Sequence, residues 1–340
     1  MRILFVASNF SWRAGVENRP VEVQLADALR ELGHEVVAVG HESRMSDEGF
    51  DICHIHHRAI ASMWRVVNPR RRCPVVYTSH SYLSYLGWST MRTAWDVREM
   101  AGVRIFTRGA DGIVCLSQRE REILNQRRAL AGKPSMAIGN AVSRDFVVDP
   151  SRIQARPAKQ PGLLFVGQLI PLKGVMGLVD AYSRLPEDLG TLSFIYHREE
   201  ILAELRQRVE QLGIADRVRF LGKLDAAAVT AELLGTGALV LPSMGESLPS
   251  VVFESLMAGT PVVASDVGGI AGQVREWGRL VPPGDVDALE QAMREVLTTH
   301  WPVQRRLEMS RETAAVTDPS NVALRHVEFY ERVLAGFRGR

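Results

Sequence analysis

Two glutamates, Glu246 and Glu254, stand eight positions apart in a segment that is otherwise largely apolar. Burying a carboxylate is costly unless hydrogen bonds or a cation compensate it. The hydroxyl groups of a sugar would supply such hydrogen bonds to one glutamate, and those of a ribose to the other. The alternative is a structural role, in which Glu246 lies on the surface and Glu254 pairs with a core arginine.

The same segment carries the signal of a helix that starts beside the glutamates. Pro249 suits the first turn of a helix, because its missing N–H group is no loss there. We therefore expect the backbone N–H groups of Ser247 and Leu248, and those that follow them, to face the carboxyl ends of the strands. Both glutamates would then border the N terminus of one helix, where an anionic ligand is favoured.

A third candidate is Lys173, in the segment Gly-Gln-Leu-Ile-Pro-Leu-Lys-Gly at residues 167–174. The segment follows an expected strand and opens an expected helix, so N–H groups, the helix dipole and an ammonium converge on an anion such as phosphate. Lysine is rare here, because 37 of the 41 basic residues are arginine. The alternative is a solvated loop lysine. The glycines match neither a P-loop nor, after the first strand, a dinucleotide fingerprint.

These side chains need a scaffold, and 340 residues are enough for two domains. Short apolar runs alternate with helical patterns in both halves, which is typical of parallel sheets covered by helices on both faces. The expected strands are Ile3–Ala7, Val36–Val39, Ile52–His56, Val75–Thr78 and Ile113–Leu116 in the first half, and Leu163–Val166, Leu192–Tyr196, Arg217–Leu221, Ala238–Leu241 and Pro261–Ala264 in the second.

A polar, proline-rich segment at residues 156–162 is expected to link the two domains. We therefore predict a first domain at 1–158, a second at 159–318 and a final helix at 319–340, whose single apolar stripe could pack on its own domain or on the first. The other expected helices are Val21–Leu32, Gln118–Arg128, Val175–Leu185, Glu200–Leu212 and Ala226–Leu234.

Charge and composition limit the kinds of partner that the protein can be expected to have. The net charge is only +2, but residues 58–133 hold fourteen basic and five acidic side chains. This excess indicates either an anionic partner, including a peripheral membrane contact, or a solvated face. We expect no nucleic-acid partner and no membrane-spanning segment. Three cysteines at no metal-like spacing, and no apparent signal peptide, favour a cytoplasmic protein with reduced thiols.

Taken together, these features resemble retaining glycosyltransferase family 4, as found in bacteria. The motifs that carry the resemblance span nearly the whole chain in the family's order. They are Gly15-Val-Glu with Gly33-His-Glu-Val, Asp51-Ile-Cys-His-Ile-His-His, Thr78-Ser-His80, Ala110-Asp-Gly-Ile-Val-Cys-Leu-Ser117, Gly139-Asn-Ala-Val142, Gly167–Gly174, Glu246-x7-Glu254, Pro261–Gly269 and Leu280-Val-Pro-Pro-Gly-Asp285. The resemblance implies an α/β GT-B fold, with two Rossmann-like, doubly wound, parallel-sheet domains facing a cleft.

The resemblance also implies roles for single residues. Glu254 would bind the ribose, Glu246 the donor sugar, and Lys173 the diphosphate as it departs. Gly15 would let the first loop approach the phosphate and acceptor closely, and His80 would face the donor sugar and the acceptor. The family further implies that the last helix crosses back to the first domain and that no metal is required.

Two departures from the family bear on the site. Gln168 replaces the usual arginine of the phosphate loop, which removes a charge that Arg13 or Arg19 could restore. The usual Gly-x-Gly segment that precedes the base contact is Tyr196-His-Arg-Glu199 here. The histidines in Asp51–His57 could suggest a metal site, but because no carboxylate cluster accompanies them in the sequence, we expect none.

The sequence thus predicts a retaining, metal-independent transferase that moves a sugar from a nucleotide diphosphate sugar to a hydroxyl acceptor. A UDP-sugar is favoured over a GDP-sugar, and the acceptor would be a natural product such as an antibiotic, or a cell-envelope glycan. Two alternatives stay open. One is an epimerase of the same fold acting on the nucleotide sugar, and the other is a sugar-nucleotide-binding protein without catalysis.

Overall fold

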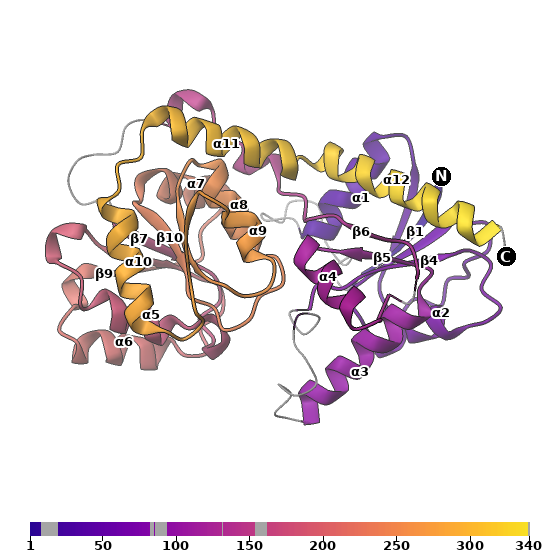
Figure 1. Cartoon of the computed structure of the whole chain (residues 1–340), viewed down its shortest axis with the longest axis horizontal. Helices are drawn as coiled ribbons and strands as arrows, with labels where there is room; N and C mark the ends of the chain where they lie inside the picture. Colours follow the sequence, from indigo (N-terminus) through magenta and orange to yellow (C-terminus); the bar gives the residue numbers. More distant parts are fainter. Residues whose placement is uncertain (8–19, 82–84, 86–93, 131, 154–161, 339–340) are drawn as a thin grey trace. The chain divides into compact units, whose positions relative to one another are not determined.

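The chain forms two compact units in the computed structural model, which describes residues 1–7, 20–81, 85, 94–130, 132–153 and 162–338. One unit comprises Met1–Ser143 together with Thr317–Arg340, and the other comprises Arg144–Val316 (Figure 1). Each unit is built around its own parallel sheet of six strands. These are two Rossmann-like, doubly wound α/β units, as the sequence predicts.

The sheet of the first unit has the strand order β2-β1-β3-β4-β5-β6. Its central strands are buried on both faces, which explains their continuous apolar sequences. The elements of this unit are β1 (Arg2–Val6), α1 (Val21–Glu31), β2 (Glu35–Val39), β3 (Ile52–His56), η1 (Ile60–Ser62), α2 (Met63–Val67), β4 (Val75–Thr78), α3 (Ala94–Gly109), β5 (Gly112–Cys115), α4 (Gln118–Gln126), β6 (Ser135–Ala137) and α12 (Pro319–Arg338).

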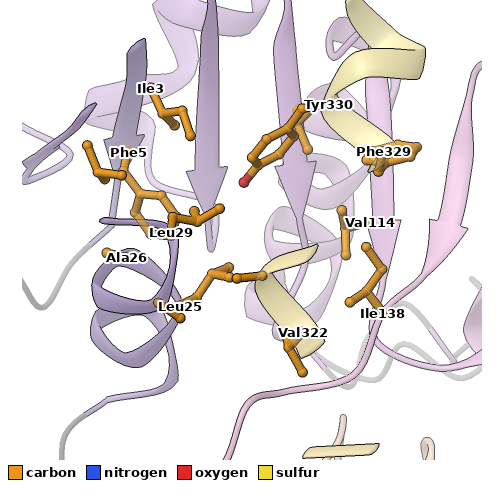
Figure 2. Close-up of a cluster of buried hydrophobic side chains, with 14 of the residues drawn as sticks. Ile3, Phe5, Leu25, Ala26, Leu29, Val114, Ile138, Val322, Phe329 and Tyr330 are labelled. Atoms are coloured by element: carbon orange, nitrogen blue, oxygen red, sulfur yellow. The ribbon is translucent and has the colours of Figure 1, made fainter. Parts of the chain in front are cut away.

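The last helix, α12, completes the core of the first unit. Its Phe329 and Tyr330 are fully buried in one cluster with Ile3 and Phe5 of β1 and Leu25 of α1. Figure 2 shows these side chains gathered between the strands, α1 and the two visible turns of α12. The apolar stripe of the helix therefore covers a face of the first sheet, although the helix is the last element of the chain.

The sheet of the second unit has the order β12-β11-β10-β7-β8-β9. Its elements are η4 (Arg144–Phe146), η5 (Pro150–Arg152), β7 (Leu163–Val166), η6 (Pro171–Lys173), α5 (Val175–Tyr182), η7 (Glu187–Leu189), β8 (Leu192–Ile195), α6 (Leu202–Gln211), η8 (Ala215–Arg217), β9 (Val218–Gly222), α7 (Ala226–Gly235), β10 (Ala238–Leu241), α8 (Ser250–Met257), β11 (Val262–Ser265), α9 (Ile270–Val274), β12 (Gly278–Val281), α10 (Val286–Thr298) and α11 (Val303–Thr317).

Each sheet reverses its strand order at one point. In the first unit the chain proceeds from β1 outward in one direction to β2 and in the other to β3. In the second unit, β7 leads to β8 and β9 on one side, while β10 begins the other side. Ligands of open α/β sheets bind at the carboxyl ends of the strands that flank such a reversal. The loops after β1 and β3, and after β7 and β10, are therefore the places to look for a site.

The chain enters the second unit at Arg144, before the expected boundary at residue 158. The reason is that η4 packs against α7 of the second unit and buries Phe146. The expected linker lies almost entirely within residues 154–161, outside the described part of the chain.

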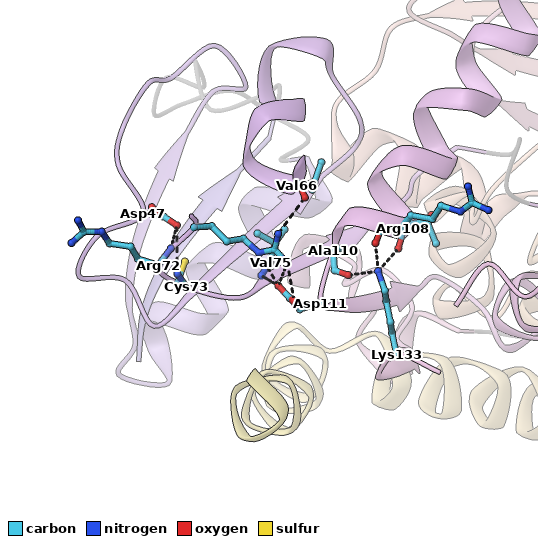
Figure 3. A network of polar contacts seen from close by, with 11 residues as sticks. Asp47, Val66, Arg72, Cys73, Val75, Arg108, Ala110, Asp111 and Lys133 are labelled. Carbon is cyan, nitrogen blue, oxygen red and sulfur yellow. Dashed lines mark hydrogen bonds and ion pairs between the residues drawn. The ribbon is translucent and has the colours of Figure 1, made fainter. Parts of the chain in front are cut away.

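Part of the basic excess in the first unit serves the fold. Lys133 donates hydrogen bonds to the carbonyl groups of Thr107 and Ala110 at the end of α3, with Nζ–O distances of 3.3 and 2.7 Å (Figure 3). A cation is favourable there because the C-terminal carbonyls of a helix carry partial negative charge. Arg71 forms a two-pronged pair with the buried Asp111. These side chains are not available to an anionic partner, and a membrane contact through the others stays a prediction.

None of the described helices has both the length and the apolar composition needed to cross a bilayer. The three cysteines, Cys53, Cys73 and Cys115, are buried with free thiols. Burial raises the pKa of each thiol, and that of Cys53 to about 12. They act as small apolar residues of the core.

Candidate active site

Lys173 is presented by the loop that follows β7, at one side of the strand reversal. It ends the short helix η6, and Gly174 then turns the chain into α5 with a φ of 66°. A side chain at Gly174 would meet the carbonyl oxygen of Pro242, because a Cβ there would lie 2.1 Å from it. Glycine thus lets this loop touch the loop that follows β10. Within the described chain, no side chain caps the N terminus of α5, so its first N–H groups can face an anion.

Glu246 lies in the loop that follows β10, on the other side of the reversal, and pairs with Lys173. The Lys173 Nζ–Glu246 Oε1 distance is 2.5 Å. Ser243 donates a second hydrogen bond to the same carboxylate oxygen at 2.8 Å. The Lys173 and Glu246 side chains are only 18% and 10% exposed. The alternative of a surface Glu246 is therefore wrong, and the two candidates form one partly buried ion pair.

The glycine pair after β11 supports the Glu246 loop from behind. Gly268 has a φ of 58°, and a Cβ there would lie 2.1 Å from the carbonyl oxygen of Glu246. The next residue, Gly269, donates its N–H group to the Ser247 carbonyl at 2.8 Å. Any larger residue at Gly268 would push this loop away, so the motif that contains the two glycines keeps Glu246 within reach of Lys173.

Ser247 and Leu248 connect this loop to α8, as the sequence predicts. The Ser247 hydroxyl is buried and has no hydrogen-bond partner among the described residues. A buried unsatisfied hydroxyl is costly, so a ligand oxygen at this point would be favourable. The Leu248 side chain is buried, which leaves only its backbone for a ligand. Pro249 is the residue before α8, and within the described chain no side chain caps this helix either.

Glu254 lies inside α8 and is largely desolvated. Burial raises the pKa of its carboxyl to about 7. Glu254 belongs to none of the ion pairs formed by described residues, so the alternative of a pair with a core arginine is not what the structure shows. Among the described residues no cation or hydrogen-bond donor compensates this buried carboxylate, and the hydroxyl groups of a ribose would do so.

Gln168 is the remaining candidate of the second unit. Gln168 follows β7 directly, with its Nε2 3.4 Å from Nε2 of His197, which follows β8. Gln168 is thus at the reversal of the strand order, close to the loop that carries Lys173.

Three further candidates from the sequence lie outside the described residues. They are Gly15 and the two arginines proposed to compensate for Gln168, Arg13 and Arg19.

In the first unit, His80 belongs to a chain of hydrogen-bonded side chains. Its Nε2 lies 3.0 Å from His56 Nδ1, and His56 Nε2 lies 3.3 Å from His54 Nδ1. His54 in turn contacts the Tyr330 hydroxyl at 2.6 Å and the Thr78 hydroxyl at 2.8 Å. Burial lowers the pKa of His54 and His56 well below its usual value, and that of His80 to about 3. These imidazoles are therefore neutral.

This cluster also contains a carboxylate, Glu22, that was not predicted from the sequence. Glu22, on the first turn of α1, is buried and accepts a hydrogen bond from His57 Nε2. Burial acts to raise the pKa of the Glu22 carboxyl, but its pKa is lowered on balance, and the hydrogen bond from His57 is the largest cause that lowers it. A single carboxylate, which is not a cluster, therefore accompanies the histidines in the structure. The only sequence signal was an acidic residue on the buried side of an otherwise apolar helix face.

The fold is that of the GT-B glycosyltransferases. A solved structure of HepE from Anabaena in complex with UDP-glucose superposes with a TM-score of 0.72 at 18% identity, covering 98% of this chain and 100% of that one. At this identity the likeness establishes the fold.

Sequence comparison establishes the family. The model described as "Glycosyl transferases group 1" matches residues 149–314, and that described as "Glycosyltransferase Family 4" matches residues 40–146. A phosphatidyl-myo-inositol mannosyltransferase of Mycobacterium leprae is 29% identical over 295 residues, which are 84% of this chain and 75% of that protein. A 2-deoxystreptamine glucosyltransferase of Streptomyces kanamyceticus is 30% identical over 251 residues, which are 67% of this chain and 62% of that protein. The chain belongs to glycosyltransferase family 4 and is a glycosyltransferase.

Proposed function

We propose that this protein transfers a sugar from a UDP-sugar to a hydroxyl group of an acceptor, with retention of the anomeric configuration. The observation that carries the proposal is the Lys173–Glu246 pair at the strand reversal of the second unit. The bond that breaks in such a reaction joins the sugar to the diphosphate. A cation for the diphosphate and an acceptor of hydrogen bonds for the sugar must therefore be neighbours, as these two side chains are.

Each residue then has a chemical task. Lys173 stabilises the negative charge that grows on the diphosphate as the bond breaks, together with the N-terminal N–H groups of α5. Glu246 accepts hydrogen bonds from the donor sugar and orients its anomeric carbon. Glu254 accepts those of the ribose. The Ser247 hydroxyl, the Leu248 backbone and Gln168 contact the phosphates or the sugar. In the first unit, His80 takes part in the transfer itself, as the sequence also predicts.

The nucleotide and acceptor are inferred from likeness. UDP-glucose is bound by the superposing HepE structure, which supports a UDP-sugar over a GDP-sugar. The names of the two relatives support an acceptor rich in hydroxyl groups, either a natural product or a glycan of the cell envelope.

Product analysis tests the proposal. Purified protein is incubated with UDP-sugars and GDP-sugars, with and without candidate acceptors, and the products are resolved by mass spectrometry and NMR. We expect a glycosylated acceptor with the donor's anomeric configuration, formed only when both substrates are present. An altered sugar nucleotide without acceptor would identify an epimerase instead. Tight nucleotide binding without any product would identify a binding protein.

We expect turnover to be independent of divalent metal. The ammonium of Lys173 and the two uncapped helix N termini supply the positive potential that a metal supplies in other transferases. Transfer should therefore proceed at an unchanged or higher rate in excess EDTA. A rate that collapsed in EDTA and returned on addition of Mn²⁺ or Mg²⁺ would show this assignment to be wrong.

Donor affinity should depend on pH through Glu254. Its carboxyl has a pKa of about 7 without nucleotide, and ribose hydroxyl groups donate to the ionised form. Binding should thus weaken as the pH falls through 7, by about tenfold from about pH 8 to pH 6. Calorimetry with an intact UDP-sugar measures this, because its diphosphate lacks an ionisable oxygen in this range. Glu254→Gln should bind more weakly and lose the pH dependence.

The same substitution gives a stability check. A folded-state pKa above the ordinary value means that the native state holds a proton which the unfolded chain releases, so stability is lost as pH rises from about 4.5 to 7. Above that range the amide of Glu254→Gln should make the protein more stable, by on the order of 2–3 kcal/mol. A variant that bound the donor normally, or that was less stable at high pH, would contradict the assignment of Glu254.

A further inference from the structure

Three potential metal ligands from three separate elements meet in the first unit. Glu22 belongs to α1, His56 ends β3, and His80 follows β4. One ligand atom from each lies within 4.8 Å of those of the other two. The closest pair, His56 Nδ1 and His80 Nε2, is 3.0 Å apart. β3 and β4 are neighbours in the sheet, so both imidazoles stand at the same edge, at the point where α1 begins.

This ligand set and spacing fit zinc. Zn²⁺ binds imidazole nitrogen at about 2.0–2.1 Å and carboxylate oxygen at about 2.0–2.2 Å in tetrahedral geometry, which places neighbouring ligand atoms roughly 3.3 Å apart. The two imidazole nitrogens are already near that separation. A small shift of the Glu22 carboxylate closes the third side. Two histidines, one glutamate and an open fourth position form a known type of zinc site.

The ligands also have the outer partners that metal sites use. His57 Nε2 donates to Oε1 of Glu22, which leaves Oε2 for an ion. The nitrogen of His56 that does not face His80 contacts His54, which is itself held by Tyr330 and Thr78. Such contacts fix the tautomer and the direction of a ligating ring.

Burial makes a cation favourable at this point. Glu22 and His56 are each only 3% exposed. A buried carboxylate is stabilised when a cation neutralises it. A narrow pocket of about 10 Å³ borders His56 and His80, which is room for about one water beside these two ligands.

We propose that Glu22, His56 and His80 bind one Zn²⁺ ion. A consequence, which rests on the proposed function, is that zinc inhibits sugar transfer, because the ion occupies the Nε2 atom of His80. Zinc would thus act on the enzyme as an inhibitor that EDTA removes, in agreement with turnover that needs no metal.

The test measures zinc binding directly. Protein stripped with EDTA and desalted is titrated with ZnCl₂ by calorimetry, and its metal content is determined after gel filtration. We expect one tight ion per wild-type chain. Glu22→Gln and His56→Asn should each weaken that binding by more than the roughly 10- to 100-fold caused by loss of an outer partner. His300→Asn, which removes an exposed histidine of the second unit, should bind as wild type does.

A second measurement covers variants that do not fold. Crystals of the wild-type protein soaked in ZnCl₂ should show an anomalous peak at the zinc edge between the three side chains. A peak elsewhere, or unchanged zinc affinity in Glu22→Gln, overturns the site. Transfer assays with zinc then separate the two proposals. If zinc binds to these ligands but does not inhibit transfer, the role of His80 in transfer is refuted and the zinc site is not. If the protein transfers sugar but does not bind zinc, only the zinc site is refuted.

Discussion

Replacing Lys173 by alanine is expected to lower kcat by about 10²- to 10³-fold, with a much smaller effect on KM. The ammonium interacts most strongly with the diphosphate when the bond to the sugar is breaking, because negative charge accumulates there in the transition state. Only interactions that strengthen in the transition state raise kcat. Steady-state kinetics with varied UDP-sugar measure both constants.

Two variants serve as controls for this result. Lys173→Arg keeps the positive charge and should recover part of the rate. Lys223→Ala removes an exposed lysine that follows β9, at the edge of the same sheet, and should leave the rate unchanged. If Lys173→Ala raised KM and left kcat intact, Lys173 would bind the donor without stabilising the departing group.

Replacing Glu246 by glutamine should cut transfer by at least about a hundredfold, because a misplacement of the anomeric carbon by about 1 Å costs that much. The same change removes the anionic partner of Lys173, which is then free to contact phosphate. Binding of UDP should therefore not be weakened. Calorimetry and transfer assays on the same preparation measure the two effects.

Two further variants of the second unit serve as controls for Glu246→Gln. Glu276→Gln removes an exposed carboxylate of the same unit and should change neither quantity. Because Lys173 and Glu246 are in contact and act on one bond, Lys173→Ala combined with Glu246→Gln should cost less than the product of the two single effects. Transfer at the wild-type rate in Glu246→Gln would reduce Glu246 to a structural partner of Lys173.

The strands that are buried on both faces were readable from the sequence alone. The observed β3, β4, β7 and β10 have the residue bounds that their apolar runs predict. β4, β7 and β10 are each flanked on both sides by glycine, proline or serine, which are typical of turns and mark the ends of the run. β12 was missed, because its two central residues are exposed and its sequence lacks a continuous apolar signal.

The candidate site was also predictable from the sequence only in part. Lys173 and Glu246 could be nominated from local sequence, because each precedes a helix and stands beside a glycine. Glu254 could be nominated from its spacing of eight positions from Glu246. That Lys173 and Glu246 form an ion pair could not, since they are 73 residues apart and meet only because β10 lies beside β7. Strand order is set by the packing of whole elements, and no local pattern specifies it.

Glu22 shows most clearly what could not be predicted from the sequence. On its own it is an ordinary glutamate in the first turn of a helix, where an acidic residue is favourable and is usually exposed. Tertiary packing turns it toward the ends of β3 and β4, where His57 donates to it and two further histidines surround it. The sequence by itself determined the family, most of the strands and the candidate residues for the donor site. Which of those residues share an electrostatic environment was decided only by the folded structure, because charge interactions depend on distance and burial in space.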